Sequence, residues 1–252
     1  MDYRESHQDR GDAYDAMLAA DPFDTYMDRW EARHIRELVP RLFPAKIPRY
    51  LDFACGTGRL TSVIAPLATE TVGVDISASM LKVAVQKLPS ARFVCGDLTT
   101  ERVPLGSFDL VSAFRFFGNA QADLRTAALR TLNQLLRPGG YLLANNHRNP
   151  LAVAQLLARS RARPEDASEH GAGNTLTHRA FAAMLGTAGF SIAEVRPIAV
   201  WQYRARLMAR AGSDPAREER LERLFCARVW ATWAPDTVIL ARKDRDLDRA
   251  ST

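Results

Sequence analysis

The stretch that decides the fold is LDFACGTGRL, residues 51–60. An apolar run typical of a buried strand leads directly into glycines at positions 56 and 58. Because glycine has no side chain, the backbone can approach a ligand there and point its amide groups at it, as in the strand-to-helix turn of nucleotide-binding folds. From this loop alone, a nucleotide clamp, a phosphate cradle and a tight turn without a ligand are all open.

Composition and charge limit the classes of protein to which the chain can belong. It has 252 residues, 47% of them hydrophobic and 25% charged, which predicts one globular domain with additions over residues 1–252. No apolar run approaches the roughly 18 residues that span a bilayer. The first residues are polar and acidic, so we expect a cytoplasmic protein without membrane contact. Three cysteines without CxxC spacing predict neither a disulfide framework nor a metal site.

Strand-like and helix-like segments alternate along the chain. Strands are expected at residues 49–55, 70–76, 91–97, 107–116 and 140–147, with amphipathic helices at 77–88 and 122–136. This alternation predicts a parallel sheet. Ser77 or Ser79 is expected to cap the first helix, and RPGG at 137–140 is expected to end the second.

The segments around this core are expected to cover it. Residues 1–47 should form an N-terminal helical cap, with a helix at 21–43 that ends near Pro40. The later elements are expected to be a helix at 150–160, a polar loop at 161–176, a helix at 177–190, a sixth strand at 191–201 and a seventh at 236–243. The 34 residues from 202 to 235 are too many for a hairpin turn. We therefore expect substrate-covering insertions at 148–176 and 202–235.

Acidic residues follow the expected strands in a series. Asp52 lies in the first strand, Asp75 ends the second and Asp97 ends the third. The carboxyl ends of parallel strands meet at one edge of a sheet, so one ligand could contact all three. Asp75 lies 19 residues after Gly56, about the spacing at which a carboxylate binds a ribose diol, and Asp97 could then accept a hydrogen bond from adenine. Each acid alone could equally be a solvated strand end or a helix cap.

These segments resemble the motifs of the class I S-adenosylmethionine-dependent methyltransferases. LDFACGTGRLT is similar to the first motif of that family, VGVDIS to its second-strand acidic motif, FVCGDLTT to its adenine-side motif and LLRPGGYLL to the element before its fifth strand. The resemblance covers about residues 48–146. It implies an α/β fold with a Rossmann-like, seven-stranded, mostly parallel sheet, helices on both faces and an antiparallel last strand. It also implies a cofactor-binding core at 48–147 and S-adenosylmethionine as the cofactor.

The resemblance implies a role for individual residues of this core. The methionine part of the cofactor would be contacted by Asp52, Ala54, Cys55, Gly56 and Gly58. The ribose would be bound by Asp75, the adenine by Ile76, Asp97 and Leu98, and the sulfonium by Ala113 and Phe114.

Candidate catalytic residues are sought at the same edge of the sheet. A hydroxyl or amine acceptor gains from a general base, and His147, directly after the fifth expected strand, is the best-placed histidine. The alternative is a strand-end histidine with only local hydrogen bonds. His170 and His178 are weaker candidates in less regular surroundings.

Arg115 ends the fourth expected strand, beside the position of the methyl group. It could bind a carboxylate or phosphate of the acceptor, or orient Asn145 or Asp97. The same segment, AFRFFGN, lacks the (Asn/Asp)-Pro-Pro-(Tyr/Phe) element of amino-methylating nucleic-acid enzymes, and it lacks the acid of magnesium-dependent catechol enzymes. We therefore expect a small-molecule acceptor and no metal.

The predicted function is methyl transfer to oxygen or nitrogen of a sugar, a nucleotide-linked molecule or a secondary metabolite. The alternatives are an RNA or protein methyltransferase, a noncatalytic cofactor-binding scaffold, and an NAD-dependent oxidoreductase. Thr61, in place of a third glycine, disfavours the last. A nucleic-acid partner is disfavoured because residues 204–224 interleave acidic residues with arginines at helical spacing. Several aromatic residues could line a lid or belong to the core: Tyr26, Trp30, Phe116, Phe117, Trp201, Tyr203 and Trp230.

Overall fold

The computed structural model describes residues 11–101, 103–152, 174–198, 220, 222–224 and 228–247. Most of the two predicted insertions, 148–176 and 202–235, lies outside these residues, and so do His170, Trp201 and Tyr203. No helix of the described part is long and apolar enough to cross a membrane.

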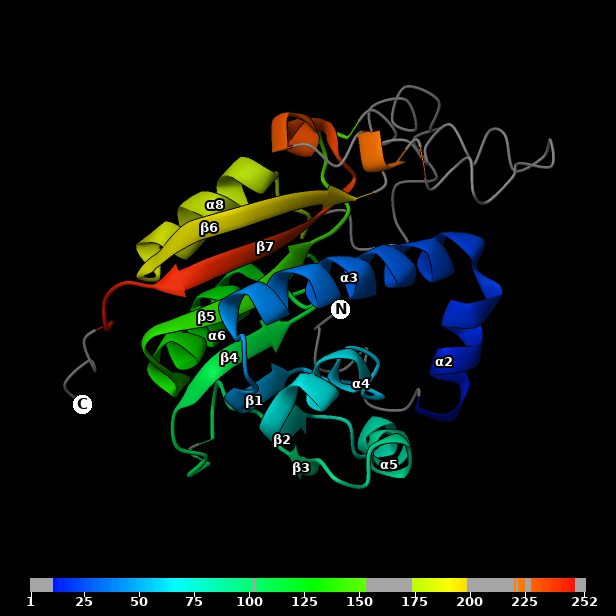
Figure 1. Cartoon of the computed structure of the whole chain (residues 1–252), viewed down its shortest axis with the longest axis vertical. Coiled ribbons are helices and arrows are strands. Elements are labelled where there is room, and N and C mark those ends of the chain that lie inside the picture. The colour runs from blue at the N-terminus through cyan, green and yellow to red at the C-terminus, as the bar shows by residue number, and fades with distance from the viewer. Residues whose placement is uncertain are drawn as a thin grey trace.

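Seven strands form one sheet in the order β3-β2-β1-β4-β5-β7-β6 (Figure 1). They are β1 Ile47–Phe53, β2 Ala68–Asp75, β3 Arg92–Cys95, β4 Phe108–Ala113, β5 Leu136–Asn146, β6 Phe190–Ile198 and β7 Asp236–Lys243. The first five strands are parallel, and β7 runs antiparallel between β5 and β6. The predicted Rossmann-like sheet with an antiparallel last strand is confirmed. The strand order reverses between β1 and β4, and ligands bind at the carboxyl edge of such a point.

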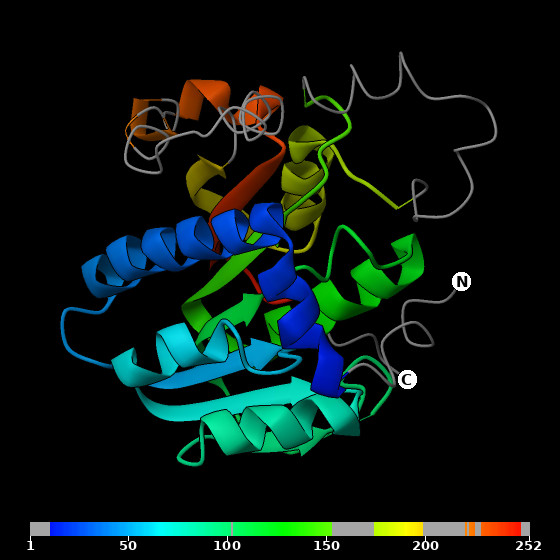
Figure 2. The same ribbon diagram turned by 90° about the vertical axis from the view of Figure 1, so that its right-hand side faces the viewer.

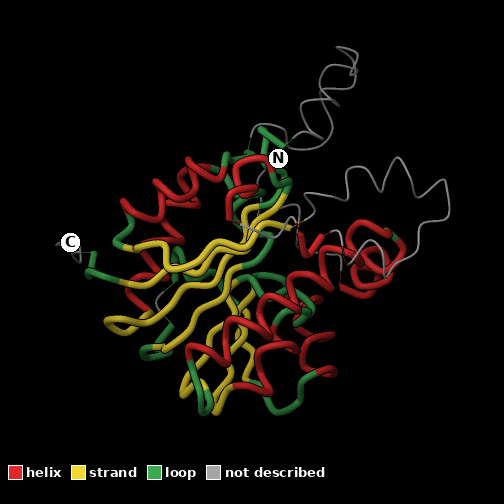
Figure 3. Tube along the Cα trace, turned by 45° about the horizontal axis from the view of Figure 1, so that its top comes forward, coloured by secondary structure: helices red, strands yellow, loops and turns green. Residues whose placement is uncertain are grey.

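Helices cover both faces of the sheet (Figures 1 and 2). They are α2 Gly11–Ala20, α3 Pro22–Leu42, α4 Thr61–Ile64, α5 Ala78–Lys87, α6 Ala122–Leu135 and α8 His178–Thr187, with short 3-10 turns η1 Ala65–Leu67 and η4 Arg228–Trp233. The core is split by the sheet. Ile35 and Leu38 of α3 pack on one face with Leu143 and Leu240, while Leu129 of α6 and other apolar residues fill the opposite face. Figure 3 shows the strands as a continuous layer between these helices.

Local sequence signals account for several helix ends. Ser77 caps α5, since its Oγ accepts a hydrogen bond from the Met80 N–H. Helix α3 runs to Leu42 rather than ending near Pro40. The Phe43 N–H donates to the Val39 carbonyl at 2.9 Å, so the last turn closes around the proline. Pro40 removes only one backbone hydrogen bond at this position, because the helix ends two residues later.

The RPGG segment differs from its prediction as a helix stop. Strand β5 already begins at Leu136, and its pairing with β4 shifts between the partners Phe108–Leu136 and Leu110–Tyr141. The segment is therefore an irregularity inside the strand. Gly139 has a φ of 74°, a conformation that favours glycine.

Four of the aromatic residues expected either in a lid or in the core belong to the core, and the side chains of the other three lie outside the described part of the structure. Tyr26, Trp30, Phe116 and Phe117 are all buried, the first two as part of α3 in the core on its side of the sheet and the others on the opposite face. Their burial stabilises the fold.

Candidate cofactor and acceptor site

The glycine loop after β1 is held in an uncommon backbone conformation. Ala54, Gly56 and Gly58 have positive φ values of 56°, 54° and 76°. A Cβ on Gly58 would also lie 3.2 Å from the Cβ of Ala84 on α5. Glycine at 58 is therefore required by both its backbone angle and the close approach of a helix.

Asp75 at the end of β2 fixes this loop. Its Oδ2 accepts a hydrogen bond from the Gly56 N–H at 2.7 Å, and its Oδ1 accepts one from the Ser77 N–H at 2.9 Å. The carboxylate thus joins the loop, β2 and the start of α5. A carboxylate oxygen can accept two hydrogen bonds, so these contacts are compatible with a ligand hydroxyl on Asp75.

Asp52 lies beneath the loop in a buried polar network. It is 2% exposed, and its two oxygens accept hydrogen bonds from Thr61 Oγ1 at 2.5 Å and Ser112 Oγ at 2.6 Å. Ser112 Oγ is also 2.6 Å from Tyr50 Oη. Thr61, which takes the place of a third glycine, therefore anchors Asp52 to α4. These contacts indicate that Asp52 positions the loop, and its contact with the amino-acid end of a cofactor stays a prediction.

The other predicted cofactor residues differ in exposure. Asp97 Oδ1 accepts hydrogen bonds from the Thr99 N–H and Oγ1, at 2.9 and 2.6 Å, and this shapes the turn after β3. Ala54, Gly56, Ile76 and Asp97 are partly exposed along one edge, whereas the remaining members are buried: Cys55, Gly58, Leu98, Ala113 and Phe114.

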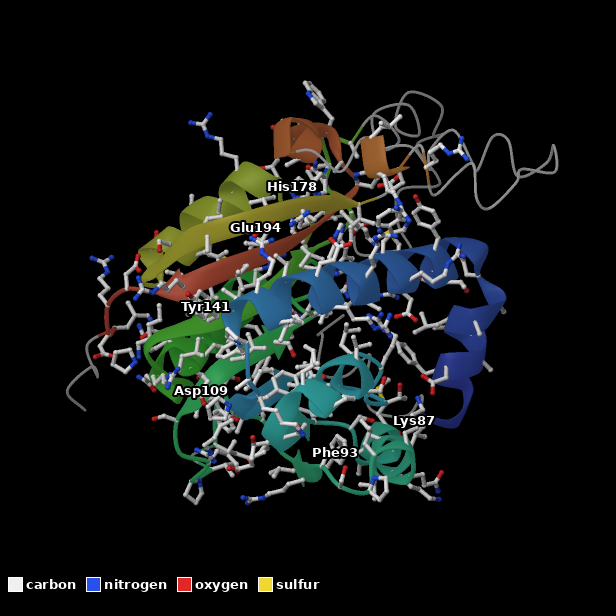
Figure 4. The ribbon with its side chains drawn as sticks, in the orientation of Figure 1. Lys87, Phe93, Asp109, Tyr141, His178 and Glu194 are labelled. Carbon is white, nitrogen blue, oxygen red and sulfur yellow. The ribbon has the colours of Figure 1, made fainter. Side chains whose placement is uncertain are left out.

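Helix α2 is bonded to the glycine loop. Asp15 accepts a hydrogen bond from Thr57 Oγ1 at 2.6 Å and pairs with the ammonium of Lys87 on α5. Figure 4 labels Lys87 on the side of α5 near α2. The N-terminal cap predicted from the sequence therefore reaches the loop itself.

Helix α3 carries an acidic face toward the same edge. Glu31 is fully buried, and its Oε2 lies 2.8 Å from Nη1 of Arg59, which also pairs with Asp28. Glu31 Oε1 accepts a hydrogen bond from Asn145 Nδ2 at 2.8 Å. One carboxylate thus links α3, the glycine loop and β5.

Arg115 is bound to α3 through its side chain and to Asn145 through its backbone. Its guanidinium pairs with Asp24 at 2.9 Å, and only its backbone N–H donates to Asn145 Oδ1, at 2.6 Å. The side chain thus contacts an acid that was not considered from the sequence, and its role toward the acceptor stays a prediction. Arg115 also has a φ of 55°.

His147 packs against the turn after β4. Its Nε2 is 3.3 Å from Asn119 Oδ1, and a Cβ on Gly118 would lie 2.9 Å from Nδ1, so the ring lies against Gly118. Burial, with Arg148 and Arg115 nearby, lowers the pKa of His147 to about 3. The imidazole is therefore neutral and a weak base, and its catalytic role stays a prediction.

Residues 27–195 match a family described as a methyltransferase domain. The chain belongs to this methyltransferase family. The family and the enzyme class predicted from the sequence are confirmed.

Named relatives of this methyltransferase act in quinone biosynthesis. The ubiquinone/menaquinone biosynthesis C-methyltransferase of Syntrophotalea carbinolica is 36% identical over 126 residues, covering 48% of this chain and 52% of the relative. The ubiquinone biosynthesis O-methyltransferase of Xanthomonas axonopodis pv. citri is 31% identical over 182 residues, covering 68% and 74%. The chain spans about half the length of several curated relatives that it matches.

A solved structure shares the fold of this methyltransferase. The magnesium protoporphyrin IX methyltransferase of Synechocystis, crystallised with bound SAH, superposes with a TM-score of 0.66. It is 15% identical, and the match covers 95% of this chain and 97% of the other.

In this methyltransferase His178, one of the weaker histidine candidates, is hydrogen-bonded to neighbouring structural elements. His178 Nε2 is 3.0 Å from the Ala234 carbonyl, and Nδ1 lies 2.8 Å from Asn146 Nδ2 and 3.1 Å from Thr237 Oγ1. These bonds tie α8 to β5, to β7 and to Ala234, which precedes β7. Figure 4 labels His178 beside α8. Burial lowers the pKa of His178 to about 4, so it is a neutral structural residue.

Asp52 gives this methyltransferase a testable pH dependence. Burial raises the pKa of Asp52 to about 6 from 3.8, while the bonds from Ser112 and Thr61 oppose the shift. A raised native pKa stabilises the fold below about pH 4, and this contribution is lost as pH rises through 6. Relative to Asp52→Asn, the wild type should lose about 2 kcal/mol between pH 4 and pH 7, as measured by urea unfolding. A pH-independent difference between the two proteins would contradict this prediction.

Proposed function

We propose that this chain is an S-adenosylmethionine-dependent methyltransferase that acts on oxygen or nitrogen of a small molecule. The observation that carries the proposal is the bond between the Gly56 N–H and Asp75 at 2.7 Å. It holds a loop with positive φ angles at the point where the strand order reverses. A carboxylate next to exposed loop backbone at this point suits a ribose and an adjoining chain of polar atoms.

S-adenosylmethionine is the cofactor that the family and the site residues support. Ala54, Gly56, Ile76 and Asp97 supply backbone, an apolar side chain and a carboxylate along one partly exposed edge. These groups match the amino-acid, ribose and adenine parts of the molecule in turn. Asp75 would hold the ribose, and Ile76 and Asp97 the adenine.

The bound cofactor supplies a methyl group that its sulfonium has already activated. The chain must then hold the acceptor in line with that methyl group and exclude water, and orientation of this kind supplies roughly 7 to 11 kcal/mol of barrier reduction. The Asp15–Thr57 bond and the Arg59–Glu31 pair hold α2 and α3 over the carboxyl edge of the sheet. These two helices are the described part of the water-excluding cover.

The acceptor would bind beside Arg115 and His147, where β4 and β5 end. Two features support a small molecule: the relatives named above act in quinone biosynthesis, and the segment after β4 lacks a nucleic-acid signature. Because one of those relatives is named a C-methyltransferase, carbon is the competing atom to oxygen and nitrogen. An RNA or protein acceptor is the runner-up.

The test is parallel calorimetric titration with S-adenosylmethionine, S-adenosylhomocysteine and NAD. We expect both adenosyl ligands to bind with micromolar or tighter affinity and NAD not to bind. Binding of NAD alone would replace the proposal with an oxidoreductase. Binding of the adenosyl ligands without turnover of any phenol, amine or sugar would favour the noncatalytic scaffold.

A further inference from the structure

A row of polar residues crosses the carboxyl edge of the sheet under α3. It consists of Asp52 on β1, Ser112 on β4, Asn145 on β5 and Asp236 on β7, four adjacent strands. The first three are hydrogen-bonded to one another or to neighbouring elements. Asp236 is 3% exposed, and its Oδ1 has no hydrogen-bond partner in the described part of the chain. A buried polar atom without a partner is costly and calls for an explanation.

The direction of the Asp236 side chain follows from the sheet pairing. Thr237 pairs with Asn146 and bonds to His178 on the α8 side. Side chains alternate along a strand, so Asp236 points to the opposite face, as do Val238 and Leu240 in the α3-side core. Asp236 therefore lies on the face that carries Asn145 and Glu31, at the ends of β5 and β7.

The charged groups around Asp236 come from three other elements. Glu31 on α3, Arg115 in the turn after β4 and Arg148 in the turn after β5 act on it electrostatically, and the backbone of Arg148 is also hydrogen-bonded to its carboxyl group. Arg115 and Arg148 are non-glycine residues with φ values of 55° and 58°. Such backbone strain is concentrated at binding and catalytic sites, where the surrounding structure maintains it.

We propose that Asp236 is the catalytic base that receives the proton of the acceptor. The proposal rests on the proposed function. The lone pair of the acceptor oxygen or nitrogen forms the new bond to the methyl carbon, and the carbon–sulfur bond breaks with its electron pair left on sulfur. The O–H or N–H proton passes to the Asp236 carboxylate and later to solvent.

The pKa of Asp236 suits the role of a base better than the pKa of His147. Burial, and next the charge of Glu31, raise the pKa of Asp236 to about 8, while Arg115 and Arg148 oppose the shift. A base is most effective when its pKa lies near the working pH. The His147 ring is a weak base and lies against Gly118.

The first experiment reads the carboxyl directly and needs no acceptor. In protein labelled with ¹³C at aspartate Cγ, one signal should titrate near pH 8 and disappear in Asp236→Asn. If no aspartate signal titrates between pH 7 and pH 9, the proposal is overturned. This result does not depend on binding of the cofactor.

The second experiment measures formation of S-adenosylhomocysteine with catechol and benzylamine as small oxygen and nitrogen nucleophiles. Wild-type turnover should rise with pH and level off above about 8, and Asp236→Asn should lower it by roughly 10²- to 10⁴-fold. The affinity for S-adenosylhomocysteine should not change. Turnover within threefold of wild type in Asp236→Asn would overturn the proposal, as would failure of the wild type to methylate either probe.

Two further variants separate catalysis from stability. Asp109→Asn alters another buried carboxyl, bonded to the Arg49 N–H at the opposite edge of the sheet, and should keep the wild-type pH profile. Asp236→Glu retains the carboxyl and should shift the profile while keeping part of the activity, which provides a test if Asp236→Asn does not fold. Failure of the wild type to bind either adenosyl ligand would instead refute the proposed function.

Discussion

Replacing Arg59 with methionine is expected to lower the free energy of unfolding by about 3 to 5 kcal/mol. Methionine keeps much of the apolar stem but removes the charge that faces Glu31, which is fully buried. An uncompensated charge in the interior is far more costly than an intact pair is stabilising. The Glu31 carboxylate is also fixed by Asn145, so it cannot turn toward water without losing that bond.

Thermal and urea unfolding would measure this effect. For a protein of this size, the predicted loss corresponds to a fall in Tm of roughly 6 to 20 °C. Arg41→Met is the matched control, because Arg41 pairs with Glu194 and its side chain is 62% exposed. That pair should contribute at most about 1 kcal/mol. If the free energy of unfolding falls equally in the two variants, burial of Glu31 does not determine the size of the decrease.

Replacing Asp75 with alanine is expected to weaken binding of S-adenosylmethionine by about 1 to 3 kcal/mol, or roughly 5- to 150-fold. The change removes the proposed acceptor of the ribose hydroxyls. It also leaves the Gly56 and Ser77 N–H groups without their carboxylate, so the loop loses its link to β2. The loss of the ribose acceptor and the loosening of the loop both weaken binding of S-adenosylmethionine.

Calorimetry with S-adenosylhomocysteine would measure the affinity of Asp75→Ala. Glu70→Ala provides the control on the same strand, since Glu70 is far from the carboxyl edge and pairs with Arg49 at 2.7 Å. Its affinity should equal that of the wild type. If Asp75→Ala also binds like the wild type, Asp75 does not hold the ribose.

The sheet was predictable because its signals are local. Each parallel strand contains a short apolar run, and the helices α5 and α6 repeat apolar residues at three and four positions. The antiparallel position of β7 between β5 and β6 is not local. It was obtained from the family resemblance and is confirmed by the pairing of both neighbours.

The contacts of α3 could not be predicted because they join distant parts of the chain. Asp24, Asp28 and Glu31 recur at helical spacing, which was a detectable signal of one acidic face. Their partners, Arg59 and Arg115, are 28 to 91 residues away in sequence. An acidic helix face is usually solvated, so the pattern alone did not indicate burial.

Asp236 was overlooked for a related reason. As the first residue of a strand, it had the sequence pattern of a solvated strand end. Its burial arises from neighbours that are distant in sequence, namely Glu31, Arg115 and Arg148. Only the folded arrangement reveals that the carboxyl is enclosed.

The two partners of the Glu31 carboxylate also have an evolutionary consequence. Its two oxygens serve different partners, one on Arg59 and one on Asn145. A substitution at any one of these three positions leaves a buried group of another without its partner, so the tolerated route is coordinated replacement. The exposed Arg33–Glu37 pair on the same helix leaves no buried charge without its partner when one member changes, so its two positions are less constrained. Within α3, residues less than two turns apart are thus subject to different kinds of selection.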